Sequence, residues 1–120
     1  MGKVKIFTEE RFLQANKKGT VYMIFWAPGC PFSERARLVG LKLRKNGIKT
    51  ELIRVGGKTG IENREKIEEA SQELKNLLQT KSLIVTWPQV FHFNNKKNNA
   101  TRLKGGYNDL ITQKDVRNSI

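Results

Sequence analysis

Residues 21–33 read VYMIFWAPGCPFS, a sequence that predicts a strand, a turn with a cysteine and the start of a helix. Its first part, residues 21–26, is short, apolar and rich in aromatic side chains, which predicts a fully buried strand. A Pro-Gly turn and Cys30 follow, and beyond them apolar side chains recur at helical spacing at Phe32, Ala36, Val39 and Leu43. This order places the sulfur of Cys30 at a helix N-terminus, where the helix dipole and the free backbone N–H groups favour a thiolate over a thiol.

The composition predicts one folded domain over residues 1–120, because a chain of this length with 38% hydrophobic residues can bury a core. No apolar run approaches the roughly 20 residues that span a membrane, so no membrane partner is expected. The first residues also lack the pattern of a secretory signal. Cys30 is the only cysteine, which excludes an intrachain disulfide and favours a reducing, cytoplasmic location.

The net charge of +12 is high for a chain of this size. Residues 1–60 hold 13 basic and 4 acidic side chains, an excess of +9 in the half that contains Cys30. Such a field attracts anions, including nucleic acid, acidic protein surfaces and small carboxylates. The alternative is a solvated basic surface. Nucleic-acid binding ranks lowest, because the basic residues are not interleaved with aromatic side chains as they are in nucleic-acid grooves.

Helices and strands are expected to alternate along the rest of the chain. Residues 48–55 alternate well enough for a second strand, parallel to the first through a right-handed crossover. The other expected elements are helices over 9–16, 32–45 and 61–79, strands over 89–93 and 101–103, and a last helix from about residue 108. This order predicts an α/β fold.

Three short motifs together resemble those of glutaredoxins, in the order in which that family has them. They are CPFS at residues 30–33, WPQVF at 87–91 and GGYNDL at 105–110. The similarity covers about residues 20–118, and its details resemble phage and viral members. The resemblance implies a thioredoxin-like α/β fold, a four-stranded mixed sheet flanked by helices on both faces. It also implies a glutathione-dependent thiol–disulfide oxidoreductase with Cys30 as the catalytic residue.

The same resemblance implies a binding site for glutathione, the co-substrate, formed by Phe32, Trp87, Pro88, Gly106, Asn108 and Asp109. Pro88 is expected in cis, so that the backbone of Trp87 faces Cys30 and pairs with an extended ligand. Asn108 would bind the γ-glutamyl end of glutathione through its backbone N–H, and Asp109 through its carboxylate. Helix capping alone is the alternative for this pair. Tyr107, like Phe32, could pack beside the ligand or elsewhere.

Two positions depart from the family. Many glutaredoxins have a lysine where this chain has Ala27, so the thiolate would rely on the helix N-terminus and on Arg35 or Arg37. Ser33 stands where a dithiol enzyme has its second, resolving cysteine, and a hydroxyl cannot attack a disulfide usefully. The chain as written should therefore follow a monothiol cycle. Ser33 could be natural or an engineered replacement for cysteine, and both origins stay open.

Other functions are weaker alternatives. Two Cys30 residues and two glutathiones could hold a [2Fe–2S] cluster between subunits, although Pro31 disfavours this scaffold. No other metal is expected, because a single imidazole, that of His92, makes neither a zinc site nor a catalytic triad. The expected protein partners are disulfide-containing substrates of a monomeric enzyme. The phage-type resemblance suggests ribonucleotide reductase among them.

Overall fold

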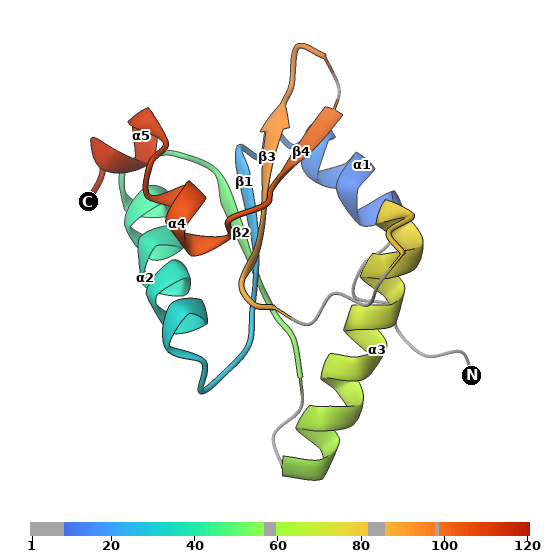
Figure 1. The fold of residues 1–120 in the computed structure, drawn as a ribbon. Helices are drawn as coiled ribbons and strands as arrows, with labels where there is room; N and C mark the ends of the chain where they lie inside the picture. Colours follow the sequence, from blue (N-terminus) through green and yellow to red (C-terminus); the bar gives the residue numbers. More distant parts are fainter. Residues whose placement is uncertain (1–8, 57–59, 82–85, 98) are drawn as a thin grey trace.

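A four-stranded sheet in the order β2-β1-β3-β4 forms the centre of the protein (Figure 1). The computed structural model describes residues 9–56, 60–81, 86–97 and 99–120. Its strands are β1 (Tyr22–Trp26), β2 (Thr50–Arg54), β3 (Gln89–Asn94) and β4 (Asn99–Leu103). Its helices are α1 (Glu9–Lys17), α2 (Pro31–Lys45), α3 (Gly60–Leu78), α4 (Tyr107–Leu110) and α5 (Lys114–Arg117).

The sheet is mixed. Strand β1 pairs in parallel with β2, with Ile24 opposite Leu52, and antiparallel with β3, with Ile24 opposite Val90. Strand β4 pairs antiparallel with β3 at the edge. The central position of β1 explains its continuous apolar sequence, because both of its faces lie against side chains and residues 22–25 are almost completely buried. The predicted parallel pairing of the first two strands is confirmed.

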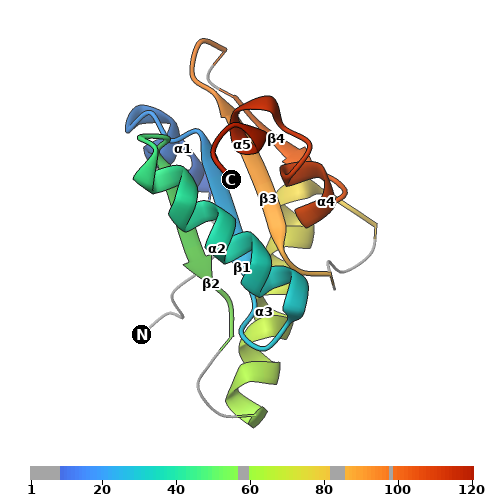
Figure 2. The same ribbon diagram turned by 90° about the vertical axis from the view of Figure 1, so that its left-hand side faces the viewer.

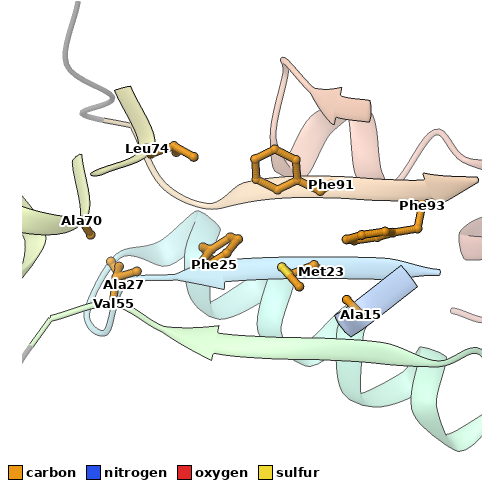
Figure 3. Close-up of a cluster of buried hydrophobic side chains, with 9 residues drawn as sticks. All are labelled: Ala15, Met23, Phe25, Ala27, Val55, Ala70, Leu74, Phe91 and Phe93. Atoms are coloured by element: carbon orange, nitrogen blue, oxygen red, sulfur yellow. The ribbon is translucent and has the colours of Figure 1, made fainter. Parts of the chain in front are cut away.

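Helices cover both faces of the sheet, with α1 and α3 on one side and α2, α4 and α5 on the other (Figures 1 and 2). Alternate residues of β1 point to opposite faces. Met23 and Phe25 belong to the core cluster on the α1 and α3 side, which Figure 3 shows. Tyr22 and Ile24 belong to the cluster on the other side. The predicted fold class is therefore confirmed, and it is compatible with the thioredoxin-like fold.

Helix α2 approaches the sheet closely because residue 40 is a glycine. A Cβ atom at Gly40 would overlap the side chain of Leu52 on β2 and would lie 3.2 Å from Cδ1 of Ile24 on β1. Three of the four predicted core residues of this helix, Ala36, Val39 and Leu43, are buried against the sheet. The position of α2 matters for the site, because Cys30 directly precedes its first turn.

Two expectations about helices were wrong in detail. Phe32, placed in the apolar stripe of α2, is 50% exposed, because it lies in the first turn, where its ring packs near Tyr107 rather than in the core. The single last helix is two short helices, since the extended backbone of Gln113 ends the α4 segment and begins α5. Within the described ranges, no helix is long and apolar enough to cross a membrane.

Candidate active site

Cys30 is the N-cap residue of α2. Its backbone is extended, with φ −90° and ψ 119°, and its carbonyl oxygen accepts a hydrogen bond of 2.9 Å from the N–H of Glu34. Its own N–H donates to the carbonyl oxygen of Ala27 at 3.3 Å, which closes the turn after β1. The thiol is half-buried. The predicted position of the sulfur at a helix N-terminus is thus confirmed.

The segment before β3 meets Cys30. The Sγ of Cys30 donates to the carbonyl oxygen of Trp87 across 3.7 Å, and both side chains pack against the core cluster beneath them. The peptide bond between Trp87 and Pro88 is cis, as the resemblance implied. A carbonyl so close to the sulfur gives an extended ligand bound to Cys30 a backbone group with which to pair.

The turn between β4 and α4 forms the next part of the site. Gly106 has φ +60° and ψ −123°, a combination that residues with a Cβ atom rarely adopt. A Cβ atom there would also lie 3.0 Å from the carbonyl oxygen of Pro88. Glycine at this position therefore lets the turn lie directly against the segment that faces Cys30.

A groove of about 230 Å³ lies where these three segments meet. Its lining residues are Phe32, Thr86, Trp87, Pro88, Lys104, Gly105, Gly106, Tyr107 and Asn108. Of the binding residues predicted from the sequence, five belong to this lining, and the sixth, Asp109, does not. The rings of Phe32 and Tyr107 lie 6.0 Å apart and form an aromatic wall at one side. A ligand in this groove would lie beside Trp87, whose carbonyl oxygen is 3.7 Å from the Cys30 sulfur.

Sequence reasoning missed Thr86 and Lys104, which also line the groove. Each directly precedes a motif that was recognised, Thr86 before Trp87 and Pro88, and Lys104 before the two glycines. That adjacency was the available signal. It was insufficient because the motifs themselves do not indicate how far a groove extends beyond them.

Asp109 has a role within the turn. Its carboxylate Oδ2 accepts a hydrogen bond of 2.6 Å from the N–H of Gly105. This bond ties the first turn of α4 to the two-glycine segment. Binding of a ligand ammonium group by the same carboxylate stays a prediction.

The two arginines expected near the thiolate have other contacts. The guanidinium of Arg37 lies 5.3 Å from the centre of the Trp26 ring, and its Nε donates to Glu34 at 3.1 Å. The guanidinium of Arg35 lies 5.6 Å from the centre of the Phe32 ring. Neither belongs to the groove lining. Ala27, at the position of the lysine in many glutaredoxins, is buried in the core.

Ser33, at the resolving position, is completely buried. Its hydroxyl has no hydrogen-bond partner in the part of the chain that the structure describes. It therefore makes no hydrogen bond to the Cys30 sulfur. A buried hydroxyl without a partner is unfavourable, whereas a thiol, a weaker hydrogen-bonding group, tolerates such a place better.

The remaining candidates lie outside this site. The imidazole of His92, on β3, packs 5.1 Å from the ring of Tyr22. Within the described ranges, no group of three or more His, Cys, Asp or Glu side chains is arranged to hold a metal ion. A larger cavity of about 670 Å³ lies near the starts of β1 and β2, whereas Cys30 follows the end of β1. Cys30 belongs to neither lining, but the smaller groove is lined by Trp87, whose carbonyl oxygen accepts from the Cys30 sulfur.

No protein-family model, curated protein or solved structure matches the chain. Membership of the glutaredoxin family therefore stays a prediction. We therefore base the assignment of a function on the fold and on the residues at Cys30 and in the groove.

Proposed function

We propose that the protein is a glutathione-dependent thiol–disulfide oxidoreductase in which Cys30 attacks glutathione mixed disulfides or protein disulfides. The main support is the position of Cys30 Sγ, at the N-terminus of α2 and 3.7 Å from the carbonyl oxygen of Trp87. The groove lined by Trp87 and Pro88 adjoins it. A thiol at a helix N-terminus, a nearby backbone acceptor and an adjacent groove are features that favour disulfide exchange on a peptide-like substrate.

The reaction follows from these groups. The Cys30 thiolate attacks the glutathione sulfur of a mixed disulfide, the substrate S–S bond breaks, and the other sulfur leaves as a thiolate that takes a proton from water. A new S–S bond now joins Cys30 to glutathione. A second glutathione thiolate attacks that bond, oxidised glutathione leaves, and the Cys30 thiolate is restored. In the net reaction one reduced glutathione is consumed: its sulfur is oxidised while the sulfur of the leaving thiol is reduced, and the glutathione of the mixed disulfide stays oxidised. Ser33 has no sulfur to resolve the intermediate, so the cycle is monothiol.

This reaction implies a cellular compartment and a set of partner molecules. A reducing compartment such as the cytoplasm would supply the glutathione, and the enzyme would act as a monomer. Its substrates would be glutathione adducts and proteins with accessible disulfides, with ribonucleotide reductase as a candidate. Neither nucleic acid nor a membrane takes part in this reaction.

Turnover of a small glutathione mixed disulfide tests the proposal. We expect the chain to catalyse it, the Cys30→Ser variant to fall to the uncatalysed rate with an unchanged circular dichroism spectrum, and mass spectrometry to find one glutathione on Cys30. A Cys30→Ser variant as active as the parent would overturn the proposal, and so would a parent chain with no activity.

The Ser33→Cys variant separates two forms of the same function. Equal turnover of the small substrate by parent and variant would establish that one sulfur suffices. Reduction of a protein disulfide that only the variant performs would identify a dithiol cycle as the ancestral one.

A further inference from the structure

The groove beside Cys30 has a single charged side chain in its described lining, that of Lys104. The other lining residues are neutral, and none is an aspartate or glutamate. The nearest acidic residue along the chain, Asp109, lies outside the lining and accepts a hydrogen bond from Gly105. In a protein of net charge +12, this groove therefore presents a positive charge without a counter-ion in its lining.

Other cations on the elements around the groove have contacts of their own and are not in its described lining. Arg35 lies over the ring of Phe32, and Arg37 lies over Trp26 and pairs with Glu34. Arg102, two residues before Lys104, donates from Nε to Oε1 of Gln89 at 2.8 Å. Lys104 is exposed to solvent and belongs to the groove lining.

The backbone around Lys104 is fixed from both sides. The N–H of Gly106 donates to the carbonyl oxygen of Leu103 at 2.9 Å, so Lys104 is the second residue of a closed turn. The N–H of Gly105 is held by Asp109 at 2.6 Å. Leu103 packs against the core cluster on the α2 side. The base of the lysine side chain is thus anchored, and only its flexible stem must be ordered when a ligand binds.

We infer that Lys104 binds a carboxylate of the substrate and makes the enzyme selective for anionic disulfides. This inference rests on the proposed function and adds to it the chemical class of substrate. Lys104 is a specificity-determining residue, because it lines the groove and takes no part in the exchange of sulfur. A contact made equally in the bound substrate and in the transition state tightens binding without changing the chemical step.

Single-turnover glutathionylation of Cys30 tests the inference without a second thiol in the assay. Two substrates are compared: the mixed disulfide of glutathione with 2-mercaptoethanol, and the same compound with both glutathione carboxyl groups esterified. We expect the parent chain to prefer the acid over the ester at subsaturating substrate. Lys104→Met should react about five- to tenfold more slowly with the acid, equally with the ester, and with an unchanged rate at saturation.

Two further variants serve as controls. Lys104→Arg should keep the preference for the acid. Lys96→Met, an exposed lysine in the β3–β4 turn, removes the same charge away from the groove and should change nothing. The preference of the parent chain should also shrink as salt is added.

The outcomes are distinguishable. If the parent chain forms no adduct with either substrate, the proposed function fails. If it reacts with acid and ester at equal rates, or if Lys104→Met keeps the full preference, the role of Lys104 is overturned and the proposed function stands. If Lys96→Met loses as much as Lys104→Met, net charge rather than the groove selects the substrate, which also overturns the inference.

Discussion

The phenol of Tyr22 donates a hydrogen bond of 2.6 Å to the Oδ1 atom of Asp115. Tyr22 begins the central strand β1 and is 1% exposed, whereas Asp115 lies in the first turn of α5. The same carboxylate oxygen accepts the N–H of Val116 at 2.9 Å. One side chain of the core therefore anchors the last helix, which covers the sheet on the same face as α2.

Tyr22→Phe should lower the free energy of unfolding by about 1.5–3 kcal/mol, the range for a hydrogen bond to a charged partner. Urea titration at pH 7 measures the loss. Tyr107→Phe is the matched control, because Tyr107 has no hydrogen bond from its hydroxyl in the described part of the chain, and it should change stability by less than about 0.5 kcal/mol. Equal effects of the two variants would contradict the assigned bond.

The same pair predicts a loss of stability in alkali. Burial, and then the hydrogen bond and negative charge of Asp115, raise the pKa of the Tyr22 phenol above its ordinary value of about 10. The stabilisation is complete below pH 10 and declines above it, because the unfolded chain loses the phenol proton first. Urea titrations of parent and Tyr22→Phe between pH 8 and 11 should show the difference in stability shrinking above pH 10. A difference independent of pH would count against the raised pKa.

Ser33→Ala should stabilise the protein by about 1 kcal/mol, since it removes a buried hydroxyl that has no partner within the described ranges. Ser71→Ala is the control. Ser71 is also buried in a helix, but its hydroxyl donates to the carbonyl oxygen of Ile67 at 2.9 Å. Both variants gain helix propensity. The difference between their free energies of unfolding therefore reports the cost of burying the Ser33 hydroxyl without a hydrogen bond. A Ser33→Ala variant less stable than Ser71→Ala would refute the prediction.

Gly106→Ala should cost about 1–3 kcal/mol and slow glutathionylation of Cys30, because φ is +60° and the new Cβ would lie 3.0 Å from the Pro88 carbonyl oxygen. Gly47→Ala separates the effect of a positive φ from the effect of the contact with Pro88. Gly47 also has a positive φ, +80°, but a Cβ there would meet nothing within 4 Å, and it lies far along the chain from the groove. Gly47→Ala should lower the free energy of unfolding but leave the rate of Cys30 glutathionylation unchanged. A normal glutathionylation rate in Gly106→Ala would show that the turn need not lie against Pro88.

Gly40→Ala sets helix propensity against packing. Alanine gains about 0.5–1 kcal/mol over glycine in a helix interior, but its Cβ would overlap Leu52 on β2, and overpacking costs about 1–3 kcal/mol. We expect a net loss in urea unfolding, because the new Cβ would also lie 3.2 Å from Cδ1 of Ile24, which is fully buried. Lys42→Ala on the exposed side should stay within about 0.5 kcal/mol of the parent. A stabilised Gly40→Ala variant would mean that α2 can move away from the sheet.

The local elements could be predicted because their signals are local. The apolar run before Ala27 predicted β1, and the spacing of Ala36, Val39 and Leu43 predicted the buried side of α2. Phe32 has the same spacing but is exposed, since periodicity does not indicate where a helix extends past its sheet. The two short helices at the C-terminus were missed for a similar reason, because the break at Gln113 is a backbone geometry without a proline or glycine to mark it.

Three features follow from the sequence alone: the parallel pairing of β1 with β2, the position of Cys30 at a helix N-terminus and the absence of a second thiol. Each depends on neighbours along the chain or on composition, whereas the mixed four-stranded sheet was implied by the resemblance. Which charged residue lines the groove depends on how distant segments fold together. The fold joins Lys104 to segments that carry Phe32 and Trp87. It leaves Arg35, over the Phe32 ring, and Arg37, over the Trp26 ring, outside the lining. Charge acts through space over a few ångströms, so the partner of a bound anion depends on how distant segments fold together and not on their order in the chain.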